Sequence, residues 1–233
     1  MQEPTRSPKS GTLPVLRALA ETVAVVSASL VALYAIAIAV GPYWSPLGML
    51  AGVVVAVLFI RGSGCALADY GFRLPASVGT TVVTTLAMVA IAFVTFYVLD
   101  PILVPVFGSP DFQIFEPLEG NLPLYLTMLL MSWVGAAFGE EVIYRGFIQT
   151  RIALAAGDGN AGWWIGIILQ ATIFASLHTY QGWTGVIEIF VFGIGVGWLY
   201  RRSGRSLLPV ILGHGIIDTT AMTAFYLGYG YAI

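Results

Sequence analysis

Long apolar stretches alternate with short polar connectors along most of this chain. Seven stretches are candidate membrane helices, at residues 20–40, 46–60, 76–99, 122–144, 161–179, 183–200 and 206–228. About 20 apolar residues suffice for a helix to cross the hydrocarbon core of a bilayer. The pattern therefore predicts an all-α fold, a polytopic transmembrane helical bundle of about seven spans. An eighth span is possible only if the long connector 100–121 also enters the bilayer.

The composition also indicates a polytopic membrane protein, and it excludes several other classes of protein. The chain is 58% hydrophobic and 9% charged, whereas a soluble domain is typically about one quarter charged. The single cysteine, Cys65, excludes an internal disulfide, and one cysteine with two histidines excludes a cysteine-rich zinc site. A net charge of −2 gives no reason to expect a nucleic-acid partner. The lipid bilayer is the partner that the composition implies.

The basic residues predict the orientation of the bundle. All 10 Lys and Arg lie in alternate connectors, at 1–19, 61–75, 145–160 and 201–205. Connectors rich in Lys and Arg remain on the cytoplasmic side. We therefore expect a multi-pass protein of the cell membrane, with a polar cytoplasmic tail at 1–19 and a single membrane-embedded domain at 20–233.

A few ionisable side chains fall inside the predicted spans, where an unpaired charge is costly and marks a candidate functional site. They are Glu140, Glu141, Arg145, His178, Glu188, His214 and Asp218. The simpler alternative is that they are helix-end charges that extend to the membrane surface. Both histidines of the chain are in this set, which favours the functional interpretation. Glu188, close to the start of its span, is better interpreted as interfacial or structural.

Spacing predicts which of these side chains converge. Glu140 precedes Gly159, in the predicted turn, by 19 residues, and His178 follows it by 19. Equal lengths on two helical arms place both side chains at one depth. Residues four apart share a helix face, so His214 pairs with Asp218 and Glu141 with Arg145, and Glu140 is left for chemistry.

The expected depths of the two histidines in the membrane disagree. His214 lies about 14 Å and His178 about 28 Å from their own inner turns at 1.5 Å per residue. The two meet only if the hairpin of spans four and five projects beyond the inner surface, with Arg145 and Arg151 near or beyond the headgroups. We expect the site in the cytoplasmic half of the membrane.

Three short patterns stand in order on three spans: Glu140-Glu141-x-x-x-Arg145, Phe174-x-x-x-His178 and His214-x-x-x-Asp218. Together they resemble the CPBP family, also called Abi, which comprises CAAX-type prenyl endopeptidases and bacteriocin-processing or immunity proteins. The resemblance covers roughly residues 136–220, within a protease-like region at about 122–228. The third pattern usually ends in Asn, and here it ends in Asp218.

The resemblance implies an intramembrane endopeptidase that cuts a membrane-associated, CAAX-like or prenylated substrate. By analogy, Glu140 is the general base, His178 its co-activator, and His214 with Asp218 stabilises the oxyanion, with Glu141, Arg145 and Phe174 in support. An ionised Asp accepts but cannot donate hydrogen bonds, which favours a His-orienting or metal-binding role for Asp218. Glu140, His178 and His214 would alternatively form a zinc site with an open position for water.

Two other functions fit the same residues. A proton- or ion-coupled transporter would use the Glu and His side chains as a relay, but such proteins are often built from internal repeats, and the sequence shows none. A non-catalytic immunity or interaction protein of the same family is the second alternative.

Overall fold

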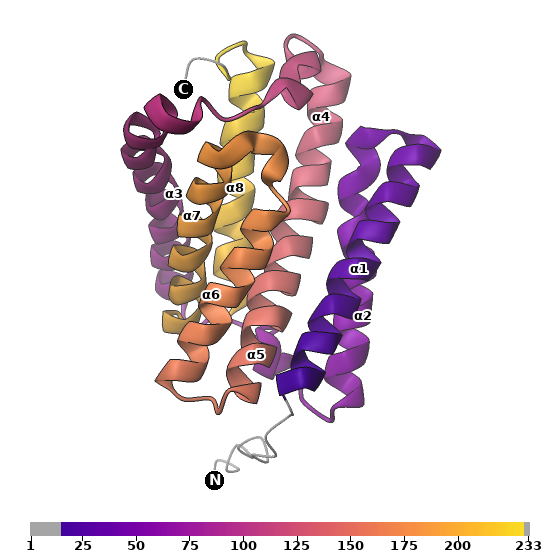
Figure 1. The fold of residues 1–233 in the computed structure, drawn as a ribbon, viewed down its shortest axis with the longest axis vertical. Coiled ribbons are helices and arrows are strands. Elements are labelled where there is room, and N and C mark those ends of the chain that lie inside the picture. The colour runs from indigo at the N-terminus through magenta and orange to yellow at the C-terminus, as the bar shows by residue number, and fades with distance from the viewer. Residues whose placement is uncertain (1–14, 231–233) are drawn as a thin grey trace.

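The computed structural model describes residues 15–230, and the regular elements in that range are all helices (Figure 1). The first half comprises α1 (Val15–Val40), η1 (Pro42–Gly48), α2 (Met49–Gly62), η2 (Leu67–Tyr70) and α3 (Val78–Phe107). The second half comprises η3 (Gln113–Leu118), α4 (Leu122–Met131), η4 (Ser132–Gln149), α5 (Thr150–Ala155), α6 (Asn160–Ser176), η5 (Thr179–Gln181), α7 (Gly182–Arg202) and α8 (Leu207–Tyr226). The predicted polytopic helical bundle is confirmed.

Six helices within the described range are long and apolar enough to cross a membrane. They are Val15–Val40, Pro42–Gly62, Val78–Phe107, Leu122–Ala155, Thr179–Arg202 and Leu207–Tyr226. The expected span 161–179 corresponds to α6, which has 17 residues and is not among the six. Figure 1 shows that the connection from α6 to α7 lies deeper in the bundle than the upper end of α4. The connector 100–121 holds the end of α3 and η3, and it adds no further spanning helix.

The helix that carries the double glutamate is longer than the predicted span 122–144. It runs without interruption from Leu122 to Ala155, and its central part, η4, has π-helical hydrogen bonding. The predicted connector 145–160 is therefore reduced to the turn at 156–159, and α1 begins within the predicted tail. Arg145 and Arg151 are fully buried inside the protein, and their expected position near or beyond the headgroups stays a prediction. Both guanidinium groups find acidic partners inside the bundle, which removes the cost of continuing the helix through them.

Small residues on η4 allow the first helices to approach it closely. A Cβ added at Gly135 would lie 2.5 Å from the Pro46 carbonyl oxygen, and one at Gly139 would lie 2.7 Å from Met49 Cβ. Small residues spaced four apart permit such backbone contact between membrane helices. The Gly135–Gly139 pair therefore fixes η1 and α2 against the helix that bears the motif.

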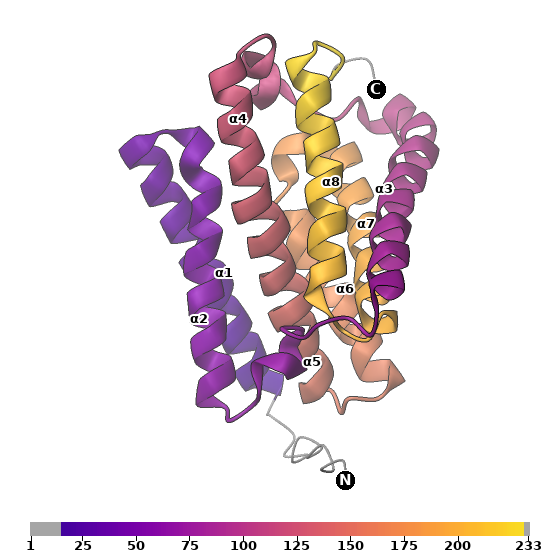
Figure 2. The same cartoon turned by 180° about the vertical axis from the view of Figure 1, so that it is seen from behind.

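Two buried glutamines attach α7 to the motif region. Gln149 Nε2 donates to the Gly197 carbonyl oxygen at 2.9 Å, and Gln170 Nε2 donates to that of Gly193 at 2.8 Å. On the other side of the molecule, α8 lies between α4 and α3 and packs on both (Figure 2). Helices η4, α6 and α8, which carry the three motifs, are thus held by neighbours on both sides.

Candidate active site

His214 on α8 lies among three carboxylates. Its Nδ1 is 2.8 Å from Glu141 Oε1, and its Nε2 is 3.9 Å from Glu140 Oε2 and 3.6 Å from Asp218 Oδ1. Since a carboxylate oxygen accepts, Nδ1–H is the donor to Glu141. This bond fixes the ring and directs Nε2 toward Glu140 and Asp218.

Glu141 also holds Arg145. Arg145 Nη1 donates to Glu141 Oε1 at 3.0 Å, and neither side chain has any exposed surface. The guanidinium carbon of Arg145 lies 4.7 Å from the centroid of the Phe174 ring, a separation typical of cation–π contacts. Glu141 therefore connects η4 to α8 through His214, and Arg145 extends the connection to α6.

The adjacent carboxylates differ in their access to solvent. Glu140 is 18% exposed and Asp218 is 22% exposed at the side chain, whereas Glu141 is fully enclosed. The 3.9 Å from Glu140 Oε2 to His214 Nε2 is longer than a hydrogen bond. Glu140 consequently keeps its oxygen atoms available for water or substrate, as a general base requires.

His178 lies in the turn that follows α6, just beyond the end of the helix. Its Nδ1 is 2.8 Å from the Phe174 carbonyl oxygen, so Nδ1–H donates and Nε2 is free to accept in the neutral ring. Its ring stacks edge-on against Phe174 at 4.7 Å between centroids. Within residues 15–230, His178 makes no ion pair with Glu140, although it is close enough to His214 and Asp218 for their charges to act on it. His178 thus borders the cluster without a direct contact to its carboxylates.

The three proposed zinc ligands are not arranged as a metal site. In the described part of the chain, no three His, Cys, Asp or Glu side chains form a group that could hold a metal ion. His214 uses Nδ1 for Glu141, and His178 does not contact Glu140. This arrangement does not fit the zinc set, and zinc stays a prediction from the resemblance.

The structure contains a second charge cluster, around Arg151, that was not predicted from the sequence. Arg151 Nε donates to Glu21 Oε2 at 2.5 Å and Nη1 donates to Tyr70 Oη at 2.9 Å, while Arg17 Nε donates to Glu21 Oε1 at 2.9 Å. The signal was present, because Glu21 is the one charged residue in the predicted span 20–40 and a lone carboxylate there needs a partner. The sequence alone could not identify that partner.

Glu188 lies apart from the motif residues. It is buried on α7, and its carboxyl group lies close enough to that of Asp100 on α3 for the two to interact electrostatically. This pair of carboxyl groups lies outside the His214 cluster, in line with a structural interpretation of Glu188.

The bundle thus has the features of a multi-pass membrane protein with a buried Glu–His cluster, and the comparison with known families is consistent with that class. Residues 122–220 match the family described as type II CAAX prenyl endopeptidase Rce1-like. The match covers all three motifs and confirms the resemblance to the CPBP family that they predicted. At the level of the family it supports a CAAX-type intramembrane protease.

One curated protein adds a more distant likeness. A protein of Escherichia coli with the name "Uncharacterized 24.3 kDa protein" is 29% identical over 97 residues, which are 40% of this chain and 42% of that protein. This chain therefore matches less than half the length of that relative. No solved structure matches the chain.

Proposed function

We propose that this protein is an intramembrane endopeptidase that hydrolyses a peptide bond of a membrane-associated, CAAX-like substrate. The observation that carries this proposal is the contrast within the double glutamate. Glu141 is enclosed and fixed by Arg145 and His214, whereas Glu140 is partly exposed beside His214. A fixed polar array beside an accessible carboxylate is what water activation requires.

In the proposed reaction, Glu140 accepts a proton from a water molecule as its oxygen attacks the substrate carbonyl carbon. His178 helps to activate this water by accepting a hydrogen bond from it at Nε2, the ring atom left free by the bond from Nδ1 to the Phe174 carbonyl oxygen. The protonated Glu140 then donates to the leaving amine, so that one residue serves as base and later as acid.

His214 is proposed to stabilise the negative charge on the carbonyl oxygen. In the doubly protonated ring, Nδ1–H donates to Glu141 and Nε2–H is available to the oxyanion. Donors fixed before reaction stabilise that charge most effectively, because no reorganisation is needed. Asp218, 3.6 Å from Nε2, orients the ring. Arg145 and Phe174 hold Glu141 from the other side.

The test is cleavage of a farnesylated reporter peptide by the full chain in liposomes, with an unprenylated reporter beside it. Glu140→Gln should lower the cleavage rate by about 10²–10⁴-fold. Its melting temperature should stay close to that of the wild type, because Glu140 makes no short contact. The exposed Glu116 provides the matched control, and Glu116→Gln should leave the rate unchanged. Undiminished cleavage by Glu140→Gln would refute the assignment, and no cleavage of either reporter by the wild type would refute the protease proposal.

Metal dependence is tested separately. A mechanism carried by Glu and His alone predicts activity that resists chelators and purified protein without stoichiometric zinc. Bound zinc that is lost in His214→Ala, together with chelator-sensitive cleavage, would favour the zinc set of Glu140, His178 and His214 instead.

We also propose that the protein resides in the cell membrane with its N-terminus on the cytoplasmic side. The placement of all 10 Lys and Arg residues in the predicted inner segments supports this orientation. Labelling of single cysteines introduced at 63 and at 110 should modify the first from the cytoplasmic side and the second from outside, after Cys65 is replaced by Ser. The reverse pattern would contradict it.

A further inference from the structure

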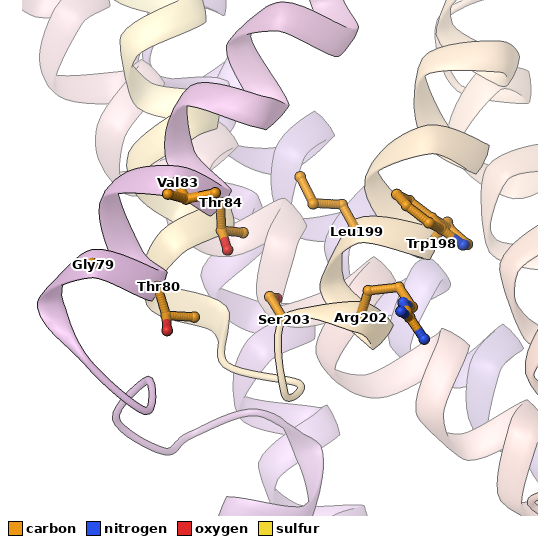
Figure 3. Close-up of a pocket in the computed structure, with 8 residues that line it drawn as sticks. All are labelled: Gly79, Thr80, Val83, Thr84, Trp198, Leu199, Arg202 and Ser203. Atoms are coloured by element: carbon orange, nitrogen blue, oxygen red, sulfur yellow. The ribbon is translucent and has the colours of Figure 1, made fainter.

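A groove lies between the first turns of α3 and the last turns of α7, away from the three motifs (Figure 3). Its volume is about 370 Å³. Thr80, Val83 and Thr84 on α3 line one side of it. Trp198 and Arg202 on α7, with Ser203 just after α7, line the other side. They combine an apolar wall with hydroxyl groups and one guanidinium group.

Two donors in the groove have no partner in the described part of the protein. The Thr84 side chain is buried, with 5% of the residue exposed, and its hydroxyl makes no hydrogen bond there. Figure 3 shows its oxygen directed toward the space between the helices. Arg202 is exposed at the rim, below Trp198, and forms no ion pair with residues 15–230. Both donors are open to the groove, so the groove favours a ligand that accepts hydrogen bonds.

The start of α3 adds a favourable field for an anion. The helix is 30 residues long, and Ser77 caps it by accepting a hydrogen bond from Thr80 N–H at 3.0 Å. The remaining N–H groups of the first turn, those of Val78 and Gly79, have no intrahelical partner, and this end of the helix carries the positive end of the helix dipole. Gly79 brings the backbone of this turn to the groove without a side chain in the way. These donors suit a phosphate.

The rest of the groove is apolar and continues into the membrane. Val83 and Leu199 line it, and the neighbouring exposed side chains of Val82 and Leu86 continue along α3. Trp198 is partly exposed at the same end, as expected of a residue at the membrane surface. A free anion would use only the polar end, whereas a lipid uses both the polar end and the apolar wall.

We propose that this groove binds the headgroup phosphate of an anionic phospholipid from the cytoplasmic leaflet. Arg202 and the start of α3 contact the phosphate, Thr84 donates to a phosphate or ester oxygen, and the acyl chains lie along the outer surface of α3. This site is separate from the proposed catalytic cluster and does not depend on it.

The experiment uses the purified full chain in detergent, titrated with phosphatidylglycerol, phosphatidylcholine or inorganic phosphate, with bound lipid counted by native mass spectrometry. The wild type should retain phosphatidylglycerol in preference to phosphatidylcholine. Arg202→Gln should lower that retention about fivefold, as expected for one basic residue near an anionic lipid. Thr84→Val, nearly isosteric, should weaken both lipids, because it removes a donor and keeps the shape.

Arg61→Gln is the matched control, because Arg61 is an exposed arginine at the end of α2, outside the groove. It should leave lipid retention unchanged. Equal retention of the two lipids by the wild type, or an equal effect of Arg61→Gln and Arg202→Gln, would overturn the proposal. Inorganic phosphate that displaces phosphatidylglycerol at equal concentration would show a site for free anions instead.

Discussion

The continuous helix from Leu122 to Ala155 carries two buried charge clusters that differ in how their charges are paired. Around Arg151, the Glu21 carboxylate pairs with Arg151 and with the half-exposed Arg17, and Arg151 also donates to the Tyr70 hydroxyl. Around His214, three carboxylates share one histidine and one arginine. Two of those carboxylates are partly exposed, whereas Arg151 is completely enclosed.

The difference separates a structural role from a chemical one. A carboxylate whose two oxygen atoms are both bonded to arginines fixes helices relative to one another, and it offers no free oxygen atom to a substrate. An excess of titratable groups with access to water is typical of catalytic sites. This contrast indicates that the Arg151 cluster attaches α1 and η2, and it supports the catalytic role proposed for the His214 cluster.

The largest expected effect is that of Arg151→Met. It leaves the Glu21 carboxylate without its buried partner, which typically costs about 3–5 kcal/mol. We expect loss of most folded protein, measured as a monodisperse peak in size-exclusion chromatography and as a lower melting temperature. The cleavage rate per folded molecule should not change. A variant with full stability but no activity would contradict the structural assignment.

A smaller effect is expected when both partners are removed. Glu21→Gln combined with Arg151→Met leaves no uncompensated charge, so the double variant should recover a large part of the stability lost in Arg151→Met. The coupling energy from the double-mutant cycle measures the interaction energy between Glu21 and Arg151. Additive effects of the two single variants would mean that Glu21 and Arg151 do not stabilise each other.

Asp218 tests the other cluster. Asp218→Ala should reduce the cleavage rate by about tenfold or more, since one group that orients the oxyanion donor is lost. Asp218→Asn should stay close to the wild-type rate, because the amide oxygen keeps a polar atom beside His214 Nε2 and the amide can also donate. Melting temperatures of both variants serve as the control for folding. A rate for Asp218→Asn as low as that for Asp218→Ala would mean that the negative charge itself is needed.

The smallest effect on stability is expected of Tyr70→Phe, which removes one hydrogen bond from Arg151. A bond to a charged group contributes about 1.5–3 kcal/mol, and the other contact of Arg151 remains. Burial raises the pKa of Tyr70 to about 12, against the opposing effect of Arg151. The folded-state pKa is above the ordinary value of about 10, so the phenol's contribution should be constant below pH 10 and decline from about pH 10 to 12. Melting temperatures of wild type and Tyr70→Phe that converge only above pH 10 would agree with this.

Much of the site was predictable because the relevant properties are local. Residues four apart on a helix are neighbours, and the structure contains the Glu141–Arg145 pair and the approach of His214 to Asp218 that this spacing predicted. The bond from His214 to Glu141 was not predicted, because it joins residues 73 positions apart. The π-helical hydrogen bonding of η4 was likewise not visible in a pattern interpreted with α-helical periodicity. In a wider helical turn, spacing by itself no longer decides whether Glu140 or Glu141 faces Arg145.

The sequence by itself determined that this is a multi-pass helical membrane protein with its motifs on three helices, because hydrophobicity and motif spacing are properties of consecutive residues. Only the tertiary structure decided which charges are paired. Arg151 reaches Glu21 across 130 positions of sequence, and that contact depends on how α1 and α5 are rotated and packed. The same packing encloses Glu141 and leaves Glu140 partly exposed, which is why we propose different roles for two adjacent glutamates.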